Sequence, residues 1–139
     1  MRILLDTNVI VDYLLRREGF FECAKKIVEV CKSNCVSGAV SSQTVADTFY
    51  ILRKDFSVAE RKAFLLRVCK IFHVEAVTED KILFALTDEN FSDFEDCLQV
   101  QCAKSFRANF IVTRNVTDFA ASEISAVTPE DFCRLFTEE

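Results

Sequence analysis

The chain has 139 residues, half of them apolar, with a formal net charge of -5 and a pI of about 5.0. This length supports one sizeable hydrophobic core, so we expect a single domain spanning residues 1–139. The acidic balance excludes a protein held on nucleic acid by a broad basic surface, and any polyanionic substrate must therefore be bound locally.

The first strand is predicted at residues 3–5, because an unbroken apolar run is typical of a strand covered on both faces of a parallel sheet. It ends on Asp6, and ligands of such sheets bind beyond the carboxyl ends of the strands. Thr7 and Asn8 add oxygen atoms beside this carboxylate. We therefore expect Asp6 in a functional site, although Asp is also a favoured N-cap and could merely cap the following helix.

Helices and strands alternate along the rest of the chain. Apolar residues at helical spacing predict helices at residues 9–14, 20–31, 45–52, 58–68, 79–86, 93–106 and 130–136. Further strands are predicted at residues 35–37, 71–77, 110–112 and 124–127. The alternation predicts an α/β fold, a three-layer sandwich with a mostly parallel central sheet of four to five strands flanked by helices.

Local signals give some of these elements defined ends and faces. Gly38 is expected to close the second strand, and Asp12 is expected on the outer face of the first helix. Ser57 and Glu60 have the spacing of a capping box, and Thr78 is a candidate cap for the next helix.

Polar residues after the strand at 110–112 repeat the pattern of the first strand. Thr113, Arg114 and Asn115 follow it directly, with Asp118 just beyond. Carboxyl ends of parallel strands lie at one edge of a sheet, so this segment is expected beside Asp6. Arg114 is the cation placed best to meet a phosphate.

Asp93 and Asp96 are three residues apart and share one face of a helix's first turn. Most acidic residues in a first turn only complement the helix dipole. If these two join Asp6, however, the cluster predicts Mg²⁺ or Mn²⁺, which prefer oxygen ligands. Such ions activate water and clamp phosphate, so phosphodiester hydrolysis is the expected reaction class.

Four segments together resemble the PIN-domain family, metal-dependent nucleases common as toxins of bacterial and archaeal toxin–antitoxin pairs. They are Leu5-Asp6-Thr7-Asn8, residues 41–54, residues 93–98, and Val112-Thr113-Arg114-Asn115 with Asp118-Phe119. Their order and spacing match over almost the whole chain. The resemblance implies a PIN-like fold and a metal-dependent endoribonuclease in which a metal-activated water attacks RNA. It also implies a possible antitoxin partner and a possible homodimer.

The resemblance further assigns individual positions. It places family carboxylates at Asp6, Asp96 and Asp118, and it places the second acidic position, commonly Glu, on Asp47, which is one methylene shorter. Taken together, the predicted residues are Asp6, Asp47, Asp96 and Asp118 for catalysis, Asp6, Asp93, Asp96 and Asp118 for the metal, and Thr7, Asn8, Thr113, Arg114 and Asn115 for substrate or support.

Two other functions stay open. A PIN-like scaffold could bind RNA or a protein without cutting, an alternative that the short Asp47 and the acidic surface support, and metal-dependent turnover would separate the two. A phosphoryl-transfer domain of the haloacid-dehalogenase type could use Asp6 as its nucleophile. Such enzymes need a second Asp two residues on, where Asn8 stands, so this function ranks last.

Seven cysteines and one histidine give no pattern of a structural zinc site, and the odd number of cysteines with no secretory leader predicts the cytoplasm. His73 lies in an apolar strand context and is expected to be packed or hydrogen-bonded rather than catalytic. No segment approaches the roughly 20 apolar residues that span a bilayer, so no membrane association is expected.

Overall fold

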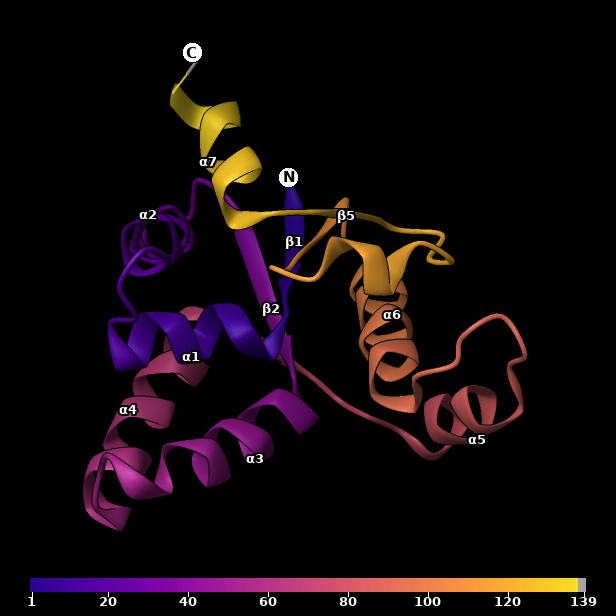
Figure 1. Cartoon of the computed structure of the whole chain (residues 1–139), viewed down its shortest axis with the longest axis horizontal. Helices are drawn as coiled ribbons and strands as arrows, with labels where there is room; N and C mark the ends of the chain where they lie inside the picture. Colours follow the sequence, from indigo (N-terminus) through magenta and orange to yellow (C-terminus); the bar gives the residue numbers. More distant parts are fainter. Residues whose placement is uncertain (138–139) are drawn as a thin grey trace.

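Five parallel strands form the centre of the protein, whose computed structural model describes residues 1–137 (Figure 1). The strands are β1 (Arg2–Leu5), β2 (Ser37–Ser41), β3 (His73–Glu75), β4 (Phe110–Val112) and β5 (Ser125–Val127). Their order in the sheet is β3-β2-β1-β4-β5, and every neighbouring pair runs parallel. The predicted α/β sandwich with a parallel sheet is confirmed.

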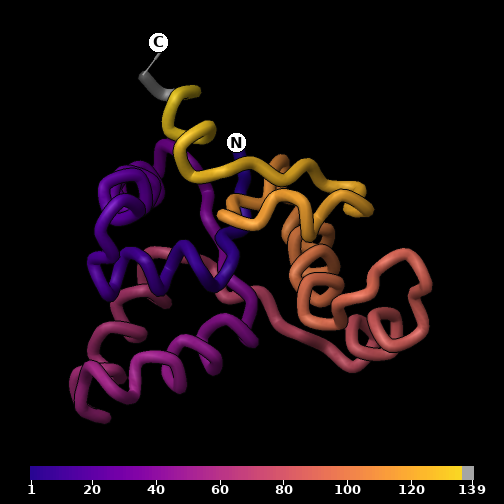
Figure 2. The backbone as a smooth tube through the Cα atoms, viewed as in Figure 1, coloured from indigo at the N-terminus to yellow at the C-terminus, as the bar shows by residue number. Residues whose placement is uncertain are grey.

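Helices cover both faces of this sheet. They are α1 (Thr7–Leu15), α2 (Phe21–Lys32), α3 (Ser42–Ile51), α4 (Val58–Ile71), α5 (Glu79–Thr87), α6 (Phe94–Phe106) and α7 (Pro129–Thr137), with short 3₁₀ turns η1 (Leu52–Lys54) and η2 (Val116–Phe119). Figure 2 shows that the chain builds α1 to α4 on one side of the molecule before it crosses to α5 and α6 on the other. Across the described residues no helix is long and apolar enough to cross a membrane.

Strand β1 divides the core into two layers. Ile3 and Leu5 pack into the cluster formed with α1, α2, α4 and α7, while Leu4 faces the cluster formed with α6. All three side chains are fully buried. Burial on both faces explains why the first strand has an unbroken apolar sequence rather than an alternating one.

The second strand lies further along the chain than predicted. Residues 35–37 were expected to form it, with Gly38 at its end, but β2 spans Ser37–Ser41 and includes Gly38. A Cβ atom at Gly38 would lie 2.7 Å from the Phe72 ring and 2.8 Å from Cys31 Sγ. The glycine therefore permits close packing of the strand against its covering layer and does not end it.

Both predicted N-cap residues stand at the start of their helices, but only one makes side-chain capping bonds. Ser57 and Glu60 form the expected capping box at α4, with backbone to side-chain bonds of 3.0 and 3.1 Å. Thr78 occupies the N-cap position of α5 but its side chain makes no capping bond. The chain before α5 is held instead by Ser42, whose Oγ accepts the Val77 N–H at 2.9 Å.

His73 is hydrogen-bonded, as expected. Its Nε2 lies 2.9 Å from Glu75 Oε2, and its ring stacks on Phe106 with 5.6 Å between centroids. This contact lies on β3, where His73 opens the strand and Glu75 ends it. Neither of these contacts indicates a catalytic role for His73.

Candidate active site

Asp6 lies where β1 ends and α1 begins. Its backbone N–H donates to the Val112 carbonyl at 2.9 Å, which continues the pairing of β1 with β4. Its extended backbone (φ -71°, ψ 157°) makes it the N-cap of α1, and Oδ1 accepts the Thr7 N–H at 2.8 Å. The capping role considered from the sequence is therefore real, and it coexists with a position at the carboxyl edge of a parallel sheet.

Four donors surround the Asp6 carboxylate. Oδ1 accepts from the Thr7 N–H and from Gln99 Nε2 at 3.1 Å, and Oδ2 accepts from Thr113 Oγ1 at 2.7 Å and from Asn8 Nδ2 at 3.5 Å. The Asn8 contact is the longest and weakest of the four. Predicted residues Thr7, Asn8 and Thr113 thus lie against Asp6 and fix the plane of its carboxylate.

Gln99 belongs to the site although it was not among the predicted residues. Its side chain is only 7% exposed, and it joins Asp6 to Thr44, whose Oγ1 accepts from Gln99 Nε2 at 3.0 Å. Gln99 stands three residues after Asp96 on the same helix, a spacing that places both on one face. That spacing was the signal available in the sequence.

Buried hydroxyls extend the network from Asp6 to the start of α3. Ser41 is the N-cap of α3, and its Oγ accepts the Thr44 N–H at 3.0 Å. Thr44 Oγ1 lies 3.1 Å from Ser41 Oγ and 2.9 Å from Thr7 Oγ1. The ends of β1 and β2 are therefore tied together by side chains as well as by the sheet.

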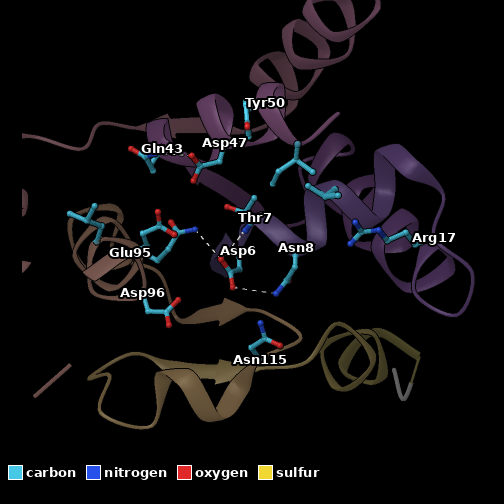
Figure 3. Close-up of a pocket in the computed structure, with 14 residues that line it drawn as sticks. Asp6, Thr7, Asn8, Arg17, Gln43, Asp47, Tyr50, Glu95, Asp96 and Asn115 are labelled. Atoms are coloured by element: carbon cyan, nitrogen blue, oxygen red, sulfur yellow. Dashed lines mark hydrogen bonds between the residues drawn. The ribbon is translucent and has the colours of Figure 1, made fainter. Parts of the chain in front are cut away.

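A cavity of about 440 Å³ opens in front of Asp6. Its lining includes Asp47, Asp96 and Asn115, and Figure 3 shows these side chains on different sides of Asp6, with Asp47 on one side and Asp96 on the other. Asp47 Oδ1 accepts from Gln43 Nε2 at 2.8 Å. The predicted Asp47 therefore does face the same space as Asp6.

Asp96 is the carboxylate whose pKa departs most from its ordinary value. Burial, together with the negative charges of Asp93, Asp6, Asp118 and Glu95, raises its pKa to about 7. Within the part of the chain that the structure describes, its carboxylate has no hydrogen bond or ion pair. Asp96 is thus close to several carboxylates and lacks any compensating partner.

Asp93 and Asp118 do not line the first cavity. Asp93 is the N-cap of α6, and its Oδ1 accepts the Asp96 N–H at 2.8 Å, so one oxygen is used in capping. Asp118 lies in η2 and is exposed. All three carboxylates line a second cavity of about 390 Å³, which makes Asp96 the residue shared by both cavities.

These oxygen donors fit a hard divalent cation such as Mg²⁺ or Mn²⁺ in chemical type. The uncompensated negative charge around Asp96 points the same way, because a bound cation would relieve it. As the side chains lie, no three His, Cys, Asp or Glu residues among residues 1–137 are close enough to hold one ion. A cation would therefore have to draw the carboxylates together.

Arg114 and Asp12 differ from expectation. Asp12 was expected on the outer face of α1 but is 1% exposed. Arg114 Nε lies 2.8 Å from its Oδ2, and Arg114 Nη2 donates to its Oδ1 at 3.1 Å, while Arg17 Nη1 lies 3.3 Å away. The guanidinium predicted to meet a phosphate is thus engaged by a buried carboxylate, and it also lies over the Phe20 ring.

Comparison with known proteins decides the family. Residues 2–117 match the family model described as PIN domain. The chain belongs to the PIN-domain family. Ribonuclease VapC1 of Aquifex aeolicus (strain VF5) is 28% identical to this PIN domain over 138 residues, which is 95% of the chain and 93% of that relative.

Solved structures share the fold of this PIN domain. A toxin–antitoxin complex from Klebsiella pneumoniae has a chain 22% identical with a TM-score of 0.68, covering 91% of this chain and 97% of that one. FitAcB from Neisseria gonorrhoeae is 18% identical with a TM-score of 0.68, covering 92% and 98%. At these identities the likeness establishes the fold, so activity must be argued from the site itself.

Proposed function

We propose that the protein is a metal-dependent endoribonuclease that hydrolyses RNA phosphodiester bonds as the toxin of a toxin–antitoxin pair. The observation that carries this proposal is the environment of Asp96, a carboxylate without donors that faces Asp6, Asp93 and Asp118 across two adjoining cavities. Clustered carboxylates at the carboxyl edge of a parallel sheet are suited to bind a divalent cation.

Asp6, Asp96 and Asp118 would hold the ion, with Asp93 contributing the oxygen that it does not use in capping. The ion would supply the activation of water and the neutralisation of a phosphate. Thr113 and its neighbours keep the Asp6 carboxylate oriented.

Asp47 and Asn115 face the cavity from opposite sides and would meet the substrate or a water molecule there (Figure 3). Arg17 also lines the cavity, although it lies 3.3 Å from Asp12, and it is the cation of this set available to a phosphate. Arg114 would support the site without contacting a phosphate. Its backbone N–H donates to Asn8 Oδ1 at 3.3 Å, and its guanidinium pairs with Asp12.

The relatives support RNA and an antitoxin as partners. Ribonuclease VapC1 is named for its activity on RNA, and one solved neighbour is a toxin–antitoxin complex from Klebsiella pneumoniae. Another is VapBC2 of Rickettsia felis bound to a DNA fragment from its promoter. We extend these roles to this chain as RNA substrate and antitoxin partner, with a homodimer as a further possibility to be measured by light scattering.

The test is cleavage of a structured RNA panel by the pure protein with Mn²⁺ or Mg²⁺ and with EDTA. We expect cleavage only with metal, and its loss in Asp6→Asn and Asp96→Asn. Asp93→Asn is the matched control, because Asn also caps helices well, and it should retain far more activity than Asp96→Asn.

Cleavage that survives EDTA would contradict the proposed chemistry. Tight RNA binding without cleavage would support a PIN-like scaffold instead. Equal losses in Asp93→Asn and Asp96→Asn would mean that the assignment of the metal ligands within α6 is wrong.

A further inference from the structure

Gln99 links three elements at the centre of the site. It projects from α6, and its Nε2 lies 3.1 Å from Asp6 Oδ1 at the β1–α1 junction and 3.0 Å from Thr44 Oγ1 on α3. Asp47 follows Thr44 by three residues on the same helix. A single amide group therefore connects the helix that carries Asp96 with the positions of two other predicted site carboxylates.

The chemistry of its neighbours fixes the orientation of this amide. An ionised carboxylate only accepts hydrogen bonds, so the NH₂ group of Gln99 must face Asp6. Its two N–H groups then serve Asp6 and Thr44. The Oε1 atom is turned away, is buried, and has no hydrogen-bond partner among the described residues. A buried acceptor without a partner is unfavourable for folding.

Packing alone does not explain a glutamine here. The adjacent residues of α6, Leu98 and Val100, are buried and apolar, and Cys97 is buried as well. An apolar side chain of similar length would fill the same volume without leaving Oε1 unpaired. The advantage of the amide must therefore lie in what its N–H groups hold.

We propose that Gln99 is a positioning residue, which orients the Asp6 carboxylate for a divalent cation and couples that orientation to α3. This inference rests on the proposed metal-dependent function. Without Gln99, Oδ1 of Asp6 keeps only the Thr7 N–H, while Thr113 and Asn8 still hold Oδ2, so the oxygen that faces α6 and α3 is less firmly placed. Partners that orient a metal ligand commonly change metal affinity by about 10- to 100-fold when they are removed.

The test is Mn²⁺ binding, measured by electron paramagnetic resonance of the free ion and by the Mn²⁺-dependent rise in melting temperature. Gln99→Met removes the donors and keeps the length of the side chain. Gln101→Met makes the same change two residues along α6, at a position that does not line the cavity. Asp6→Asn provides a site without its central carboxylate.

We expect Gln99→Met to bind Mn²⁺ at least about tenfold more weakly than the parent, and to melt in EDTA at or above the parent temperature. Gln101→Met should bind Mn²⁺ like the parent. Parent-like Mn²⁺ affinity in Gln99→Met would overturn the inference, as would a normal affinity combined with a large loss of stability.

Thr44→Val keeps the test decisive if Gln99→Met does not fold, because it removes the other acceptor that holds the amide. It should weaken Mn²⁺ binding, and an unchanged affinity would overturn the inference. A parent protein that binds Mn²⁺ normally but does not cleave RNA would refute the proposed function alone. A parent that binds no Mn²⁺ would refute both.

Discussion

Replacing Asp96 by Asn should stabilise the protein in EDTA at alkaline pH and leave its stability unchanged near pH 4. The structure raises the Asp96 pKa from 3.8 to about 7 through burial and through four neighbouring carboxylates. The folded protein therefore keeps a proton that the unfolded chain releases at lower pH. The stabilising contribution of this group is complete below about pH 4 and is lost as the pH rises through 7.

The size of the effect follows from the shift and from the exposure of the site. A rise of the Asp96 pKa from 3.8 to about 7 corresponds to about 4 kcal/mol if the group is fully buried. Asp96 is only half-buried, and solvent screening reduces this to about 1 to 2 kcal/mol. At pH 8 we expect Asp96→Asn to raise the melting temperature by roughly 3 to 8 °C, given the size of the domain.

Thermal melts of parent and variant in EDTA between pH 4 and 8 measure this directly. Glu22→Gln removes the same charge from the first turn of α2, at an exposed position, and should give no comparable gain. If Asp96→Asn is no more stable than the parent at pH 8, or if the gain is the same at pH 4, the raised pKa of Asp96 does not lower the stability of the parent.

Three further substitutions test the fold around the site. Asp12→Asn should lower the free energy of unfolding, measured in urea, by about 3 kcal/mol, because it leaves Arg17 and Arg114 without their buried anionic partner. A urea midpoint like that of the parent would contradict the buried ion pair. Gly38→Ala should cost about 1 to 3 kcal/mol through the clash with Phe72, and a neutral result would mean that the sheet and its covering layer separate easily. Asp6→Ala should lower the free energy of unfolding by about 2 kcal/mol in EDTA, since four donors lose their acceptor. It should also abolish the rise in melting temperature that Mn²⁺ gives the parent. A variant that is still stabilised by Mn²⁺ would exclude Asp6 as a ligand.

The overall fold could be predicted from local patterns in the sequence. The unbroken apolar run of residues 3–5 indicated a strand buried on both faces, and the polar residues after it and after residue 112 indicated one functional edge of the sheet. The capping box at Ser57 marked the start of α4 because both partners lie within four residues of each other. Signals of this kind are readable because cause and effect are close together in the chain.

Features that depend on distant residues could not be predicted in the same way. Asp12 is polar and was expected outside, but its partner Arg114 comes from a segment 102 residues away. The prediction that Gly38 ends a strand fails because the side chains that crowd it, Cys31 and Phe72, belong to elements whose packing the sequence does not reveal. Gln99 was missed because its importance appears only when Asp6 and Thr44 are brought beside it.

The two central carboxylates of the site have opposite environments, and this difference bears on how a cation would be bound. Asp6 accepts four hydrogen bonds, so its position and orientation are set before any ion arrives. Asp96 accepts none and faces other carboxylates, so its charge is unfavourable until a cation relieves it. A rigid first ligand lowers the entropy lost on binding, and an uncompensated second ligand increases the electrostatic gain. Asp96 therefore destabilises the cation-free protein, and a bound cation would restore that stability. Asp6 is held in a fixed orientation, because a misplaced oxygen there would misalign the ion.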